Sequence, residues 1–115
     1  MHVWTRYAEE LRGWMHTSGF GSQHCPDDRQ HPAHLFALMA PDLDTRQRFI
    51  AHLAERGVKA VFHYVPLHDS PVGASFGERH LPVTSSISER LVRLPLFATM
   101  DDAMVDRVVE AVTSF

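Results

Sequence analysis

Apolar residues recur every three or four positions at the start of the chain and predict an amphipathic helix over residues 2–16. The positions that form this stripe are Val3, Trp4, Tyr7, Ala8, Leu11, Trp14 and Met15. Three of them are large aromatic residues on one face of the helix, and such a face requires a partner to cover it. In an isolated domain we expect this face either to promote self-association into a homo-oligomer or to lie in a shifted helix.

The segment that follows has no apolar period and predicts a connecting loop over residues 16–32, because it is rich in Gly, Ser, Asp and Pro. A short apolar run at 34–40 then predicts a first strand, since it is too short for a helix that fills a core. This pattern divides the chain into an N-terminal helix with its loop, residues 1–33, and a small domain, residues 34–115.

The next elements alternate between helix and strand. Asp44 is suited to cap a helix that ends at Gly57, and the β-branched run at 58–64 predicts a second strand. Pro66 stops that strand because it has no backbone N–H donor. Residues 65–82 show no period, and irregular stretches of that length inside a domain are usually functional or disordered; we favour a functional loop.

Near the C-terminus the pattern predicts a helix over 85–93 with a serine cap, a short strand at 94–97, and a last helix that begins after Thr99 or Asp101. The predicted fold class is therefore α+β. We expect a small antiparallel or mixed sheet of about three strands with helices mainly on one face, plus the N-terminal amphipathic helix, which can stand apart from the rest.

Length and charge exclude several classes of protein. A chain of 115 residues suffices for one domain with its own core. The net charge of −3 gives no electrostatic reason to expect nucleic acid as a partner. No apolar run approaches the roughly eighteen residues that a membrane span needs, and the N-terminus carries acids where a signal peptide would be apolar. We therefore expect a cytoplasmic protein without a membrane partner, and the lone Cys25 agrees with that.

With these elements placed, the second part of the chain resembles the C-terminal small domain of the DegT/DnrJ/EryC1/StrS sugar aminotransferases. The residues that carry the resemblance lie between about 32 and 115 and are the runs HLFALM, ERGVKAVFHYVPLHDSPVGASFGE and SERLVRLPLF. The likeness is closest to the dTDP-4-amino-4,6-dideoxygalactose transaminases. It implies the C-terminal domain of a fold type I aminotransferase, which uses pyridoxal phosphate (PLP) and works as a dimer.

The resemblance also implies an activity for the full-length enzyme. That enzyme would move an amino group from glutamate to a 4-keto-6-deoxy sugar nucleotide, in the synthesis of lipopolysaccharide or antigen sugars. In this family the lysine that binds PLP belongs to a large N-terminal domain, whereas the single lysine of this chain is Lys59, at the start of a predicted strand. We therefore expect this chain alone to contain no catalytic residue and no PLP contact.

Two interpretations of the chain remain. It is either the C-terminal domain of such an aminotransferase, with the large PLP-binding domain and the dimer mate as its partners, or a shortened paralogue that serves as a non-catalytic binding or assembly module. The first interpretation expects activity when the chain meets a separately made large domain. The second expects oligomerisation or capture of another protein without that domain.

The candidate substrate contacts lie in the run FHYVPLH, residues 62–68. The resemblance implies that His63, Tyr64 and His68 lie over the mouth of the active site and contact the nucleotide sugar. Tyr and His combine an apolar body with a polar tip, which suits sugar recognition. The alternative is that His63 is a satisfied core residue and Tyr64 only packs. In the following loop, Arg79 is the residue suited to an anionic diphosphate, although a solvated loop arginine is the more common case.

A metal site is the competing interpretation of the histidines. His24, Cys25, His31 and His34 offer four potential zinc ligands within eleven residues. The adjacent His-Cys pair and the single thiolate match none of the usual spacings of structural zinc sites. We therefore expect no metal, or at most an incidental surface site.

Overall fold

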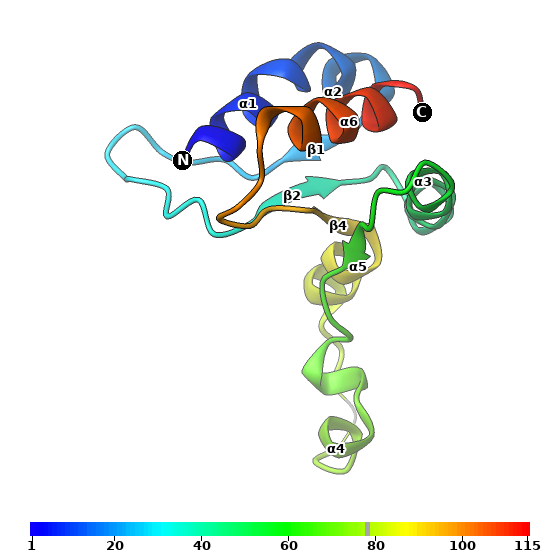
Figure 1. The fold of residues 1–115 in the computed structure, drawn as a ribbon. Helices are drawn as coiled ribbons and strands as arrows, with labels where there is room; N and C mark the ends of the chain where they lie inside the picture. The colour runs from blue at the N-terminus through cyan, green and yellow to red at the C-terminus, as the bar shows by residue number, and fades with distance from the viewer. Residues whose placement is uncertain (78) are drawn as a thin grey trace.

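The computed structural model describes residues 1–77 and 79–115 and shows a small sheet with helices packed on it (Figure 1). It confirms the predicted α+β class. In chain order the elements are α1 (His2–Glu10), α2 (Arg12–Ser18), β1 (Gly21–Ser22), β2 (Phe36–Met39), α3 (Leu43–Glu55), β3 (Val61–Phe62), the 3-10 helix η1 (Leu67–Asp69), α4 (Pro71–Ala74), α5 (Pro82–Arg90), β4 (Leu91–Leu94) and α6 (Asp102–Thr113).

The sheet is antiparallel throughout, with the strand order β1-β2-β4-β3. Its register pairs Phe36 with Leu94 and Leu38 with Val92, so these four side chains share one face, and all four are buried. The sheet has four strands instead of the expected three, because the two residues of β1 extend it beside β2. So short a strand leaves no apolar period in the sequence from which to predict it.

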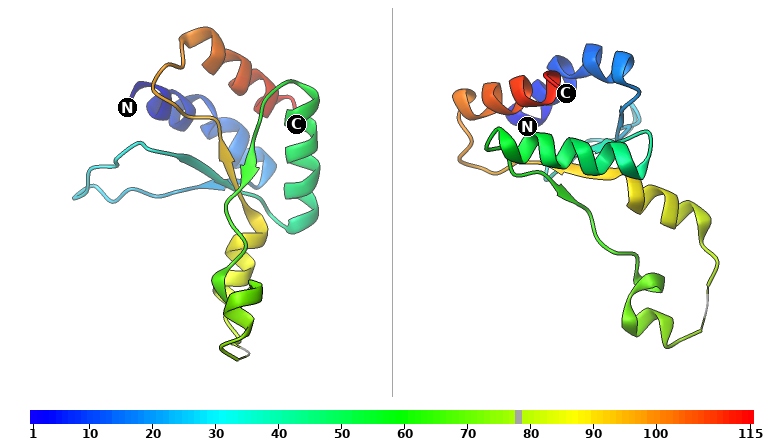
Figure 2. Two further views of the ribbon diagram at one scale, coloured as in Figure 1. Left: turned by 60° about the horizontal axis from the view of Figure 1, so that its bottom comes forward. Right: turned by 90° about the vertical axis from the view of Figure 1, so that its right-hand side faces the viewer.

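Helices α1 and α6 cover the apolar face of the sheet, and α3 flanks it (Figures 1 and 2). The guanidinium of Arg6 on α1 holds these two helices together. Its Nε donates to Glu10 at 2.6 Å and its Nη2 donates to Asp106 on α6 at 2.6 Å. Tyr7 and Leu11 are completely buried in the same core as the sheet, so the N-terminal helix does not stand apart.

The aromatic face of the N-terminal helices is covered by this chain itself. Trp4 stacks on His31, with ring centroids 4.5 Å apart, and Trp14 packs at 4.7 Å from Phe20. This face is therefore covered within the chain, and self-association through it stays a prediction. The loop that follows the helices folds back over them and supplies the missing partner, which a helical period alone does not reveal.

Several predicted boundaries shift for local reasons. The second predicted strand spans 58–64 in sequence, but only Val61–Phe62 pairs with β4, since β3 is an edge strand. The last strand is Leu91–Leu94 and not 94–97, because Pro95 cannot donate a ladder hydrogen bond. Helix α5 begins at Pro82, three residues before the predicted 85, and proline suits the first turn of a helix.

The two longest helices have aspartate caps. Asp42, and not the expected Asp44, caps α3: its Oδ1 accepts the N–H of Thr45 at 2.7 Å. Asp101 caps α6 by accepting the N–H of Met104 at 2.8 Å, as one of the two predicted starts requires. In the described part of the chain, no helix combines the length and the apolar character needed to cross a membrane.

Between β3 and α5 the chain leaves the body as a projection, residues 63–77 and 79–81, which we call the arm (Figure 2). The sequence predicted irregular loop here, and the structure instead contains η1 and α4. Ser70 caps α4, because its Oγ accepts the N–H of Gly73 at 3.0 Å. Large apolar side chains of the arm are exposed, among them Leu67 at 86% and Phe76 at 74%.

Candidate functional site

His63 lies where the chain leaves β3 and enters the arm. The β3–β4 register sets Val61 beside Arg93, and Arg93 Nη1 then donates to His63 Nδ1 at 3.1 Å. Burial lowers the pKa of His63, and the nearby Arg93 and His34 lower it further. The ring is therefore neutral at pH 7, with Nδ1 as acceptor and its proton on Nε2. His63 is half-buried and pairs with a side chain, not with a core carbonyl.

Tyr64 follows in an unusual backbone conformation, with φ of +68° in the left-handed region. Such a conformation costs a tyrosine on the order of 1–3 kcal/mol and is often found at functional sites. The side chain is 68% exposed, and its ring lies 4.1 Å from the His63 ring at 38°. Tyr64 therefore does not pack in the core, and the two rings form one outward-facing surface.

Tyr64 also borders a cavity of about 440 Å³ between the root of the arm, α3 and α5. Arg46 of α3 lines this cavity and is only 8% exposed. Its Nη1 donates to the carbonyl of Ser88 at 3.2 Å, and its guanidinium lies 5.3 Å from the Phe62 ring. Its buried Nε has no hydrogen-bond partner among the described residues. Aromatic and polar walls of this kind suit a polyhydroxylated ligand.

His68 lies farther along the arm, and its side chain is 8% exposed. Its Nε2 is 3.2 Å from Ser85 Oγ on α5 and 3.5 Å from Asp69 Oδ2. The contact with Ser85 ties the arm to α5. Arg79 is exposed and shares a cavity of about 670 Å³ with His68, Asp69 and His80.

The structure thus brings the four predicted residues together as two pairs, His63 with Tyr64 and His68 with Arg79. Sequence reasoning missed Arg93, which orients His63, and Arg46, which lines the Tyr64 cavity. A signal for Arg93 does exist, because it is the single polar residue in the strand LVRL. Arg46 carries no such signal, since a helix arginine is usually solvated.

The histidines of the first loop do not form a metal cluster. In residues 1–77 and 79–115, no three His, Cys, Asp or Glu side chains are grouped in a way that could hold a metal ion. Both ring nitrogens of His31 have protein partners: Nδ1 accepts the N–H of Ala33 at 2.8 Å, and Nε2 is 3.1 Å from Gln23 Nε2. Cys25 Sγ instead lies 3.4 Å from the carbonyl of Arg29.

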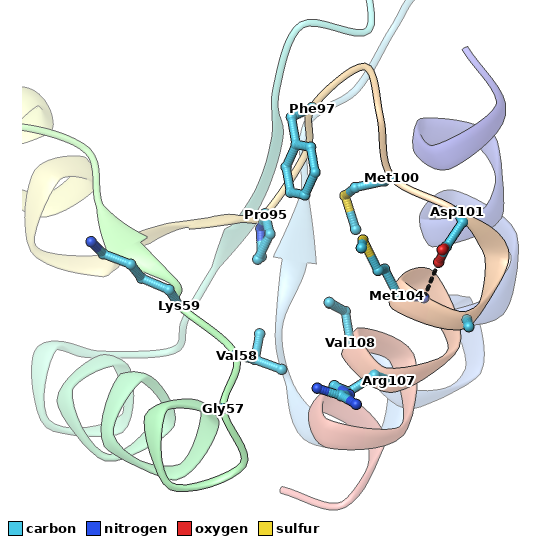
Figure 3. A pocket seen from close by; sticks show the side chains of 11 residues that line it. Gly57, Val58, Lys59, Pro95, Phe97, Met100, Asp101, Met104, Arg107 and Val108 are labelled. Carbon is cyan, nitrogen blue, oxygen red and sulfur yellow. Dashed lines mark hydrogen bonds between the residues drawn. The ribbon is translucent and has the colours of Figure 1, made fainter.

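An apolar cavity of about 550 Å³ lies between α6 and the chain on either side of Val58 (Figure 3). Phe97, Met100 and Met104 form much of its wall, and the described site residues His63, Tyr64, His68 and Arg79 do not line it. Figure 3 shows the Lys59 side chain directed away from this cavity.

These residues do not fit a PLP site. Binding of PLP as an imine requires a lysine amine in an enclosed pocket, and the single lysine of the chain, Lys59, is exposed. No carboxylate of the described residues forms an ion pair with it. The described residues therefore do not offer the enclosed amine that binding of PLP as an imine needs.

Comparison with known proteins places this fold among aminotransferases. The family model "DegT/DnrJ/EryC1/StrS aminotransferase family" matches residues 1–113. The chain is 31% identical over 90 residues to the dTDP-3-amino-3,6-dideoxy-alpha-D-galactopyranose transaminase of Aneurinibacillus thermoaerophilus; the match covers 77% of this chain and 24% of that protein. It is 34% identical over 92 residues to the pleiotropic regulatory protein of Geobacillus stearothermophilus, with the same coverage of 77% and 24%.

Solved structures agree. DesV of S. venezuelae, determined in complex with a ketimine intermediate, superposes with a TM-score of 0.86 at 26% identity, over 98% of this chain and 30% of that one. The aminotransferase TlmJ of Streptoalloteichus hindustanus gives a TM-score of 0.84 at 24% identity, over 98% and 30%, and shows the shared fold. The chain spans about a quarter of the length of the curated relatives it matches. By this family match over nearly its whole length, the chain belongs to the DegT/DnrJ/EryC1/StrS aminotransferase family.

Proposed function

We propose that this chain is the C-terminal small domain of a PLP-dependent nucleotide-sugar aminotransferase, and that His63 and Tyr64 contact the sugar nucleotide. The observation that carries the proposal is the His63–Tyr64 pair. Tyr64 is held in a strained backbone conformation with most of its ring exposed, and Arg93 fixes the ring of His63 beside it. A rigid aromatic surface with two polar tips suits a ligand that has both apolar faces and hydroxyl groups.

The surroundings of this pair support a sugar-sized ligand. The cavity beside Tyr64 is lined by polar groups on α3 and α5, including Gln47 and Glu89, together with the ring of Phe62. Sugar hydroxyls both donate and accept hydrogen bonds, so amide and carboxylate oxygens are suitable partners.

For His68 and Arg79 we propose different parts. The His68 side chain is nearly buried and lies beside Ser85, so its contribution is to hold the arm in shape at the edge of the substrate surface. Arg79 is exposed near the tip of the arm and remains available to an anionic group such as a diphosphate.

The substrate class follows from the relatives and from the resemblance of the sequence. The relative from A. thermoaerophilus is named for a dTDP-linked 3-amino-3,6-dideoxygalactose, whereas the sequence motifs are closest to enzymes that make 4-amino sugars. A dTDP-linked keto-6-deoxy sugar satisfies both, with glutamate as amino donor. In the full-length protein, PLP and its lysine belong to the part of the relatives that this chain does not match. The dimer mate is a second copy of the full-length protein.

The test uses the full-length polypeptide that contains this chain. His63→Gln and Tyr64→Phe should raise the KM for the nucleotide sugar about tenfold, while the half-reaction with the amino donor keeps its rate. His16→Gln, at an exposed position on α2, is the matched control and should leave both unchanged. If neither variant alters the KM or turnover for the sugar, the contact assignment is wrong.

A second function is favoured by one observation, the exposed apolar side chains of the arm. Patches of this kind usually mark surfaces that contact another protein. As a non-catalytic assembly module, the chain would form a stable oligomer on its own through the arm. Sedimentation analysis of the 115-residue chain at micromolar concentration distinguishes the two functions. The assembly module is supported if the chain forms an oligomer that the substitutions Leu67→Asp and Phe76→Asp convert to monomers. The aminotransferase is supported if the chain is a monomer and restores activity to a separately made large domain.

A further inference from the structure

The face of the sheet opposite the helices carries a row of basic side chains. Successive residues of a strand point to opposite faces, so Lys59, Val61 and His63 lie on one side of the extended segment that contains β3. The register places Arg93 of β4 directly beside Val61. Arg93 is therefore the diagonal neighbour of both Lys59 and His63, at a separation that long side chains bridge.

A cavity of about 250 Å³ lies at this face and is lined by Lys59, Val61 and Arg93, and His63 is joined to it through its hydrogen bond with Arg93. Its polar walls are His34, Lys59 and Arg93, and its apolar floor includes Val61 and Pro95. Lys59 borders this cavity and also the larger apolar one beside α6, and Figure 3 shows its ammonium directed away from the apolar side. Three separate segments of the chain thus each place a basic group around one small cavity.

The positive charge of this cluster is not neutralised within the part of the chain that the structure describes. No carboxylate there forms an ion pair with Lys59 or Arg93. The one hydrogen bond of the Arg93 side chain goes to the neutral nitrogen of His63, so the guanidinium keeps most of its five N–H donors for another acceptor. Repulsion within the cluster also contributes to the lowered pKa of His63.

We propose that the cluster formed by His34, Lys59, His63 and Arg93 binds a phosphate-type oxyanion. A guanidinium presents parallel N–H donors that match two oxygens of a phosphate group, and an ammonium contributes a point charge beside it. The existence of this site does not depend on the function proposed above. Only the identity of its natural ligand, a nucleotide diphosphate, rests on that function. The proposal places the diphosphate of the substrate at this sheet face and replaces the assignment to Arg79, which lies at a different cavity on the arm.

The test is a titration of the 115-residue chain with inorganic pyrophosphate, followed by NMR on the backbone amides of β3 and β4 and on the histidine rings. Binding should shift these signals, weaken as salt is added, and raise the pKa of His63 because the bound anion offsets the nearby cations. Arg93→Gln and Lys59→Gln should each weaken binding by at least roughly fivefold, since each removes a charged donor. Arg12→Gln, an exposed arginine on α2, removes the same charge and should leave the affinity unchanged.

Two results would overturn the proposal. One is an unchanged affinity in both the Arg93 and the Lys59 variant; Lys59 is exposed, so its variant keeps the fold even if the Arg93 variant does not. The other is a dicarboxylate such as glutarate binding as tightly as pyrophosphate, which would replace the phosphate class with a carboxylate. Failure of the proposed function is seen separately: pyrophosphate would still bind, while His63→Gln and Tyr64→Phe would leave sugar kinetics in the full-length protein unchanged.

Discussion

The hydroxyl of Tyr7 on α1 donates a hydrogen bond of 2.9 Å to the carbonyl of Pro95, in the connection between β4 and α6. This bond joins the first helix to the segment that follows the strand carrying Arg93. Tyr7 also packs edge-on against Phe36 of β2, with ring centroids 5.4 Å apart. The N-terminal helix is thus an internal support of the sheet, and the site residues depend on it indirectly.

We predict that Tyr7→Phe lowers the free energy of unfolding by about 1–2 kcal/mol, because the part-buried carbonyl of Pro95 loses its donor while the ring packing is kept. Urea denaturation followed by circular dichroism measures this. The exposed Tyr64→Phe removes the same hydroxyl from the surface and should change stability by less than about 0.5 kcal/mol. Equal losses in the two variants would contradict the role given to the Tyr7 bond.

A second prediction concerns the close approach of two backbone segments in the arm. A Cβ at Gly73 would overlap the carbonyl of Leu67, so Gly73→Ala forces η1 and α4 apart. Overpacking of this kind costs about 1–3 kcal/mol. The destabilisation should be confined to the arm, so protease should cleave the arm of the variant faster than that of the wild type.

Gly13→Ala is the matched control, because nothing lies within 4 Å of a Cβ at that helical position. Alanine there should stabilise the chain by about 0.5–1 kcal/mol, since it restricts the unfolded state. If Gly73→Ala leaves the arm as resistant to protease as the wild type, the packing of η1 against α4 is not as described.

A third prediction concerns pH and the cap of α3. The bond from the Thr45 N–H to Asp42 lowers the pKa of this carboxyl below its usual value. A depressed carboxyl pKa stabilises the fold above the unfolded value of about 4, and this contribution is lost as the pH falls through the folded value. Asp42→Asn keeps an acceptor but not the charge. The stability difference between wild type and variant should shrink as the pH is lowered from about 5 to 2, as measured by urea denaturation at each pH.

A fourth prediction concerns His63. Its pKa should lie below the ordinary value of about 6.5, and Arg93→Gln should raise it by removing a nearby positive charge. The histidine ring signals in an NMR pH titration report this directly. Because the folded pKa is depressed, the contribution of His63 to stability is complete above about pH 6.5 and declines as the pH falls below it. An unchanged pKa of His63 in the Arg93 variant would mean that the two side chains are apart in solution. Arg48→Gln on α3 is the control and should leave the pKa of His63 unchanged.

The elements that the sequence predicts well are those with a strong local signal. Helix α3 combines an apolar stripe, an aspartate near its start and a glycine at its end, and the run at 34–40 contains β2. The proposal that His63 and Tyr64 contact a substrate came from the resemblance to the aminotransferase family, not from a local period. The features that were missed have no local signal. Strand β1 is only two residues long, and Arg46 is held in place by contacts with Phe62 and Ser88, which are distant in the sequence.

The sequence by itself determined the α+β class and the positions of the main helices and strands. These follow from periods of two and 3.6 residues and from residue types, which act over a few positions. Only the tertiary structure decided that the aromatic helix is covered by its own loop, that His63 pairs with Arg93 thirty residues away, and that Lys59 and His34 join them at one sheet face. Contacts between distant segments depend on strand register and on how the layers pack, and neither is written in a local pattern.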